Sequence, residues 1–218
     1  MALSRREFVG TTAFALAGVS SAAGIGQEQR QNSDPVLDAI VANFKELRRD
    51  GDEQPGQRRG VLRATETLTG VLAAHLSRHY DPDLKRSIRQ QLQRKGRAAL
   101  VQELTTRVNK PGITHEAIYS MLARLERDGM GGVLRDVQKA TRRMRENAPP
   151  DYLQVRSVTQ FDFCSDLNWI IGITEMSAAL ACALAAGFAA LNPAADAACA
   201  GATMALALYL AMKMWYNC

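Results

Sequence analysis

Cysteine is absent from the first 163 residues of this 218-residue chain, so no disulfide can lie within them. Positive charge is nearly absent from the rest, because Lys213 is the only Lys or Arg after residue 160. All four cysteines lie in that second part, whose single Lys and four Asp or Glu give a net charge of −3. The chain therefore divides into a long part without cysteine and a shorter, weakly acidic part that holds all of it.

Motifs of catalysis are also missing. The sequence contains no nucleophile elbow, no phosphate-binding loop and no pair of carboxylates with supporting residues. Asp162 and Asp166 lie four residues apart, but helix N-termini favour carboxylates through the helix dipole alone. We therefore assign no catalytic residue and no cofactor, and we favour a non-catalytic protein over an enzyme.

Two histidines have the spacing of a metal site but lack further ligands. His75 and His79 are four residues apart and share one face of a helix, as in zincins. Leu76 stands where zincins carry the catalytic glutamate, and only His115 remains as a third imidazole. We therefore predict no metal centre and keep His75 and His79 as weak candidates for one.

The central part of the chain is basic. Residues 8–160 carry 24 Lys and Arg against 17 Asp and Glu, a net charge of +7. Such a region can bind phospholipid or nucleic acid, but solvated helix faces have the same composition. The segment from His115 to Gly129 resembles the recognition helix of PadR-type winged-helix regulators. That family needs a β-hairpin wing after the glycine, whereas this sequence continues into another helical pattern, so we expect no nucleic-acid partner.

The N-terminus has the three parts of a secretory signal, which are a positive start, an apolar core and small residues at a cleavage site. Arg5 and Arg6 supply the charge, and the core at residues 9–19 is too short to span a bilayer. Small side chains at 21–23 predict cleavage after Ala23. The sequence therefore predicts a signal peptide at residues 1–23.

This segment resembles a twin-arginine (Tat) signal. The pattern Ser/Thr-Arg-Arg-x-Phe followed by an apolar residue is matched at Ser4, Arg5, Arg6, Phe8 and Val9. Gly10 replaces the Lys that often comes next, and the core is diluted by Gly, Ala and Thr, as in Tat signals. The resemblance implies that the Tat translocase exports the folded protein to a periplasmic or extracellular location. The alternative is a chance arginine pair before an uncleaved N-terminal anchor.

Five amphipathic helix patterns follow one another between residues 34 and 147, and no strand pattern occurs there. Capping or breaking residues separate them, such as Lys110-Pro111-Gly112 after the third. The sequence therefore predicts a basic helical bundle at 34–147, with helices at 34–50, 61–80, 81–108, 114–128 and 133–147. We expect a loop at 51–59 and a flexible mature N-terminus at the polar residues 24–33.

The remaining sequence predicts a linker and an apolar helix pair. The linker is expected at 148–163, where residues 152–163 carry a weak strand pattern. From Trp169 to Met212 the sequence is apolar on every helix face, and Asn192-Pro193 divides it into two halves. Each half is about 27–36 Å long as an α-helix. A helix that is apolar all round lies either in a protein core or in lipid, and the predicted fold class is all-α.

The positions of the cysteines predict how they pair. Residues that lie opposite each other in an antiparallel hairpin have numbers that add up to a constant. Cys182 with Cys199 gives 381 and Cys164 with Cys218 gives 382, so both pairs centre on the expected turn at Asn192-Pro193. Small residues allow the close approach that a disulfide needs. We expect two nested disulfides in a hairpin at 164–218, with four unrelated buried cysteines as the alternative.

Aromatic and charged residues at the open end of this hairpin predict a membrane interface. Trp169 lies near Glu175 on the first helix, and Trp215 and Tyr216 return to the same level on the second. Amphipathic aromatics favour the headgroup region, and an interfacial position avoids the cost of placing Glu175 at the bilayer centre. The hairpin is therefore expected to enter lipid with its turn first.

A Tat signal, a helical body and an apolar tail with cysteines together resemble the precursors of Tat-exported microhalocin-type bacteriocins. The likeness lies in the layout and in the Ala- and Gly-rich tail. Two features differ, since this tail has four cysteines where the family has many more, and the body is basic rather than acidic. The resemblance implies a membrane-active C-terminal peptide. The alternative is a non-catalytic envelope protein, for binding or structure, whose hairpin is buried in its core or docked in the membrane.

Replacement of Arg5 and Arg6 by lysine keeps the charge of the signal but removes the paired guanidinium groups. We expect the double variant to remain as a precursor in the cytoplasm, measured by fractionation of cells that express either form. Normal export of the double-lysine form would replace the Tat assignment by a general secretory signal.

Overall fold

The structure is a computed structural model, and it describes residues 34–148, 158–187 and 192–218. The export motif, the cleavage site at Ala23 and the segment 24–33 lie outside the described residues. The described residues belong to the compact unit Val36–Cys218, together with Asp34 and Pro35 directly before it.

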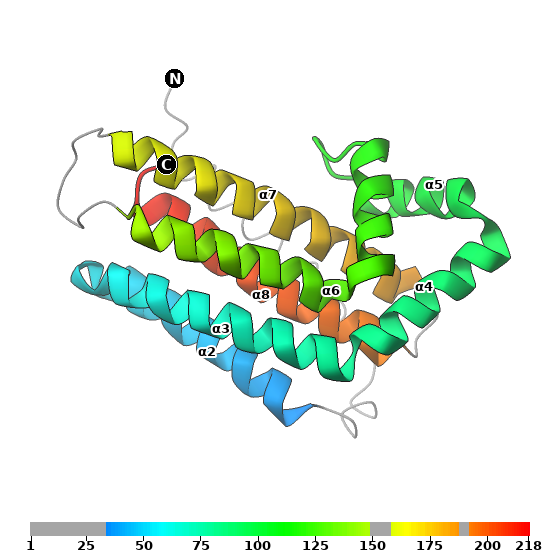
Figure 1. The fold of residues 1–218 in the computed structure, drawn as a ribbon, viewed down its shortest axis with the longest axis horizontal. Coiled ribbons are helices and arrows are strands. Elements are labelled where there is room, and N and C mark those ends of the chain that lie inside the picture. The colour runs from blue at the N-terminus through cyan, green and yellow to red at the C-terminus, as the bar shows by residue number, and fades with distance from the viewer. Residues whose placement is uncertain (1–33, 149–157, 188–191) are drawn as a thin grey trace. The chain divides into compact units, whose positions relative to one another are not determined.

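The described residues form seven α-helices and no strand, which confirms the all-α prediction (Figure 1). The helices are α2 (Pro35–Glu53), α3 (Arg58–His79), α4 (Asp81–Lys95), α5 (Arg97–Val108), α6 (His115–Glu146), α7 (Val158–Gly187) and α8 (Pro193–Trp215). We call α2 to α6 the body and α7 with α8 the hairpin. In Figure 1 the hairpin lies along the body, with α8 next to both α7 and α3.

Several predicted boundaries are corrected. Helix α2 runs through Glu53 and a 3-10 turn at Pro55–Gln57 follows, so the expected loop at 51–59 is nearly filled by helix. The expected single helix at 81–108 is broken at Gly96, whose φ of 78° lies in the left-handed region. Two helices therefore replace one, and the chain can turn between α4 and α5.

The expected linker at 148–163 is too long at its C-terminal side. Helix α7 begins at Val158, so the weak strand pattern at 152–163 does not give a strand over 158–163. The physical reason is burial of Phe163, which is fully covered and lies with its ring centroid 4.5 Å from that of Tyr216. The helical turn before Cys164 brings this aromatic side chain into the core.

Helix α6 is bent at Gly129, as the predicted helix end there suggested. Gly129 has φ 71° and ψ −179°, and a Cβ at this position would overlap the Asp81 carboxylate. That carboxylate accepts hydrogen bonds from the backbone N–H groups of Met130 at 2.8 Å and Gly131 at 3.1 Å. Asp81 is the first residue of α4, but its side chain caps the second half of α6. Burial raises the pKa of Asp81, and the two backbone N–H groups oppose this shift.

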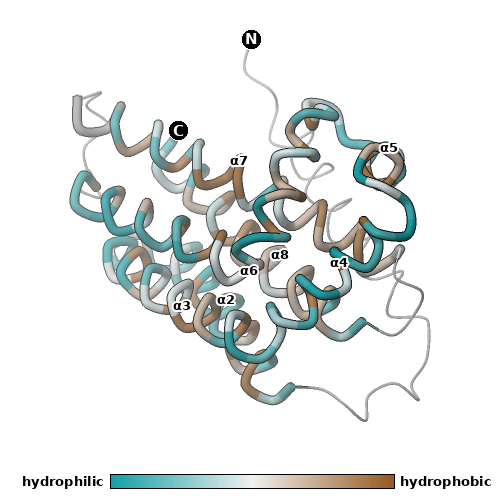
Figure 2. The backbone as a smooth tube through the Cα atoms, turned by 45° about the vertical axis from the view of Figure 1, so that its right-hand side comes forward, coloured by the Kyte–Doolittle hydropathy of each residue, from teal (hydrophilic) through white to brown (hydrophobic). Residues whose placement is uncertain are grey.

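Body and hairpin share one hydrophobic core. The apolar residues of the five amphipathic patterns are largely buried, among them Phe44, Leu62 and Leu122. Val36 and Val71 belong to the same patterns but are 50% and 47% exposed. The hydrophobic colour in Figure 2 is concentrated along α7 and α8, while hydrophilic stretches recur along α3 and α4. The hairpin therefore supplies apolar surface that the amphipathic body helices cover on one side.

Replacement of Asp81 by alanine leaves the Met130 and Gly131 N–H groups buried without an acceptor. We expect the free energy of unfolding to fall by about 1–3 kcal/mol, measured by urea titration of the circular dichroism signal. The matched control is Asp83→Ala, two residues away, whose side chain is 61% exposed and pairs with Arg86. That variant should change stability by less than about 0.5 kcal/mol. Equal effects of the two variants would contradict the capping role.

Candidate functional site

Two disulfides close the hairpin, as the numbering of the cysteines predicted. Cys164 and Cys218 are bridged with Cα atoms 5.4 Å apart, and Cys182 and Cys199 with Cα atoms 4.7 Å apart. In the chain-entropy description, loops of 54 and 17 residues correspond to about 4 and about 3 kcal/mol of stabilisation. Disulfides persist in oxidising environments, so the bridges indicate an exported, oxidising compartment.

Small residues let α7 and α8 approach closely enough for these bridges. Ala178 and Ala181 on α7 and Ala198, Ala202 and Ala205 on α8 are all buried. At the turn, the Asn192 side chain accepts hydrogen bonds from the N–H groups of Ala194 and Ala195, and Pro193 is the first residue of α8. Asn192-Pro193 therefore divides the two helices as predicted, with Asn192 acting as the N-cap of the second.

One face of α8 docks on α3 at two successive levels. Leu72 lies against Gly201, where an added Cβ would come within 3.0 Å of the Leu72 Cδ1 atom. Further along, the Tyr209 hydroxyl lies 3.1 Å from Thr69 Oγ1 and 2.8 Å from Thr141 Oγ1 of α6. All three hydroxyl-bearing residues are fully buried. The residue numbers of the contacts increase along α8, from Gly201 to Tyr209, while they decrease along α3, from Leu72 to Thr69. The two helices therefore run antiparallel.

The open end of the hairpin is held by Trp215. Its indole packs on Gly51 of α2, where any Cβ would overlap the ring. The indole N–H donates to Asp52 Oδ1 at 2.7 Å, and Arg58 of α3 donates to the Trp215 carbonyl oxygen at 2.9 Å. We call this arrangement the Trp215 latch.

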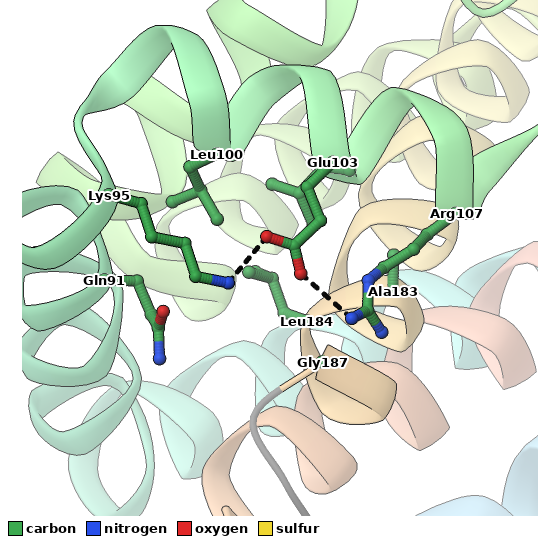
Figure 3. Close-up of a pocket in the computed structure, with 9 residues that line it drawn as sticks. Gln91, Lys95, Leu100, Glu103, Arg107, Ala183, Leu184 and Gly187 are labelled. Atoms are coloured by element: carbon green, nitrogen blue, oxygen red, sulfur yellow. Dashed lines mark hydrogen bonds and ion pairs between the residues drawn. The ribbon is translucent and has the colours of Figure 1, made fainter.

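Charged residues of α4 and α5 border the turn end of α7. Figure 3 shows Lys95 and Arg107 reaching Glu103 from two sides, at 2.6 Å and 2.9 Å, next to Leu184. The hydrogen bond from Lys95, with help from Arg107, lowers the pKa of Glu103. The Arg107 guanidinium also lies beside Gly187, the last residue of α7. Polar groups of the body therefore surround the apolar hairpin at both ends.

The four residues predicted at a membrane interface have different surroundings in this structure. Trp169 is 44% exposed, whereas Tyr216 is buried against Phe163. Glu175 forms an ion pair with Lys110 of the body at 2.8 Å. Trp215 belongs to the latch described above. In the docked form, three of these four side chains are therefore engaged within the protein.

The weak metal candidates lie close together but gather no third ligand. The rings of His75 and His79 are 4.8 Å apart, and His75 also contacts Tyr80. His115 lies elsewhere, with Nδ1 3.4 Å from Thr105 Oγ1. The described parts of the chain hold no group of three or more His, Cys, Asp or Glu suited to a metal ion.

Sequence reasoning missed the contacts of Tyr209 and of the Trp215 latch. Tyr209 and Thr203 are the only hydroxyl side chains between residues 197 and 212, in a segment without charge. A lone polar group in such a helix needs a partner wherever the helix is buried, and this was the available signal. The identity of the partners depends on residues 68 and 140 positions away and is not encoded locally.

The hairpin helices are also long and apolar enough to cross a membrane, over Asp162–Gly187 and Pro193–Trp215. In the most apolar part of each helix, 50% of the first helix and 56% of the second are buried within the protein.

Comparison of the chain with protein families, curated proteins and solved structures gives no match.

Replacement of Tyr209 by phenylalanine removes the hydroxyl that joins α8 to Thr69 and Thr141. We expect a loss of about 1 kcal/mol in the free energy of unfolding, because buried threonine hydroxyls lose their partner. Tyr119→Phe is the control, since Tyr119 is 47% exposed and its ring contact with Arg97 survives the change. Chemical denaturation of both variants gives the comparison. A Tyr209→Phe protein as stable as wild type would mean that the hydroxyl adds nothing to docking.

Proposed function

We propose that this protein is an exported precursor whose body carries the hairpin in a covered state, and whose hairpin acts on membranes after release, like a bacteriocin. One observation carries this proposal. Two helices of membrane-spanning length are joined by two disulfides into one covalent unit. Both bridges lie within the hairpin, so the unit stays closed without any bond to the body.

The contacts of the body fit the task of keeping such a hairpin in water. Exposed apolar surface costs roughly 25 cal/mol per Å², so an isolated hairpin would be poorly soluble. About half of the most apolar part of each helix is buried in the folded protein, by the other hairpin helix and by the body together, and the body adds polar contacts near the hairpin ends, such as Lys110 with Glu175. A Tat signal would match this arrangement, because that pathway is expected to carry the covered, folded form.

A second candidate is a non-catalytic envelope protein in which the hairpin never leaves the body. The fully buried hydroxyl group of Tyr209 favours this candidate, since its two bonds to Thr69 and Thr141 would be lost in lipid. The shared core favours it as well, because release would expose body residues such as Leu72. The two candidates differ in whether the hairpin separates.

Cleavage between body and hairpin decides between them. A specific protease site in place of residues 151–156 allows purified, oxidised protein to be cut next to dye-filled vesicles. We expect dye release after cutting and none before it. The uncut parent protein, treated with the same protease, is the control. Intact mass with and without reduction reports whether the hairpin is separate and both bridges are present.

A hairpin that stays on the body after cutting, with no dye release, would support the envelope protein and contradict the bacteriocin-like function. A separated hairpin that leaves the vesicles sealed would also contradict it. In either case the disulfides must be intact for the result to count, which the mass measurement establishes.

A further inference from the structure

One side of the docked hairpin is apolar and is not covered by the body. Trp169 and Met214, on different helices, are 44% and 49% exposed. The partly buried Met176 lies seven residues after Trp169, and Leu206 and Leu210 lie eight and four residues before Met214, so each set shares one helix face. Residues that lie opposite each other in the hairpin have numbers that add up to about 382. Met176 therefore lies opposite Leu206, and Trp169 lies one residue from the position opposite Met214. We call these five residues the outer strip.

The outer strip carries no charge of its own, and two charged residues beside it, Glu175 and Lys213, have polar partners within the protein. No Asp, Glu, Lys or Arg occurs between Glu175 and Asp196, or between Asp196 and Lys213. Glu175 is held by Lys110 at 2.8 Å. Lys213 donates to Asn168 Oδ1 at 2.8 Å. Covering the strip would therefore remove apolar surface from water while these edge charges keep their partners.

The surface shape of the outer strip fits lipid better than it fits a protein partner. Small residues lie among the large ones, and a Cβ at Gly172 would meet nothing within 4 Å. Fluid acyl chains adapt to such an uneven apolar surface, whereas a protein partner needs matching pockets for its buried anchor residues. The strip is also continuous with helices of membrane-spanning length, and Trp169 at its end is of the type that prefers the headgroup region.

We propose that the intact protein, with its hairpin still docked on the body, binds a lipid bilayer through the outer strip. The hairpin then lies along the membrane surface, and the body covers its other side. This inference rests on the proposed membrane action of the hairpin and adds a binding step before release. Its consequence is that the hairpin leaves the body in contact with lipid, so its apolar helices never cross open water.

The two tryptophans of the chain allow a direct test, because Trp169 lies on the outer strip and Trp215 lies in the latch. Full-length mature protein is mixed with vesicles of phosphatidylcholine and phosphatidylglycerol, and fluorescence and co-sedimentation are measured. Wild type should bind and shift its emission to the blue. Trp169→Phe keeps an apolar ring at the strip and leaves only Trp215, so it should bind without a shift.

A blue shift in Trp169→Phe would show that Trp215 has also entered lipid. The hairpin would then not stay docked on the body at the membrane, which overturns this inference but leaves the membrane action of the hairpin standing. Absence of binding by both proteins would overturn the inference as well. The proposed function would then stand or fall with the cleavage experiment alone.

Charge substitutions separate docking by the strip from attraction of the basic body to anionic lipid. Met214→Glu places an acid in the strip and should weaken vesicle binding by at least about tenfold. Val71→Glu is the matched control, since Val71 is 47% exposed but lies on α3 of the body. It should bind as wild type does. Equal binding by Met214→Glu and wild type would overturn the inference.

Discussion

The nested disulfides are the constraint on which the rest of the structure depends. They fix α7 and α8 in one register, and the small residues of the seam then give a helix pair that is apolar on almost every side. Such a pair cannot remain bare in water, so the amphipathic helices of the body are needed as a cover. The body in turn contributes only one half of the shared core and depends on the hairpin for the other.

The contacts between the body and the hairpin are specific at a few positions and non-directional elsewhere. Leu72 against Gly201, the Tyr209 hydroxyl between two threonines, and the Trp215 latch place α8 along α3 in one position. Between these points the buried residues of α8 are apolar side chains with little directional preference, namely Ala202, Ala205, Leu208, Ala211 and Met212. A small number of polar contacts therefore determines how firmly the hairpin is held, while the apolar contacts determine that it is held at all.

Features that depend on neighbouring residues or on the spacing of residues in the sequence were predictable. Features that depend on contacts between distant residues were not. The cysteine pairing followed from numbering around Asn192-Pro193, and most helices followed from their periodicity. Asp81 begins α4, but its carboxylate caps another helix, and its partners lie 49 and 50 residues further along the chain. The helix break at Gly96 and the exposure of Val71 likewise depend on how helices pack, which periodicity does not record.

The antiparallel fit of α8 on α3 has a consequence for oxidation. Four cysteines allow three pairings, and in a chain without tertiary structure nothing separates them. The contacts of α8 with the body fit the same register as the disulfides, so docking favours the pairs Cys182–Cys199 and Cys164–Cys218 over the two alternatives. In this way the body favours correct thiol pairing. A chain that folds with reduced cysteines would need only an oxidant to reach its final covalent form, without reshuffling.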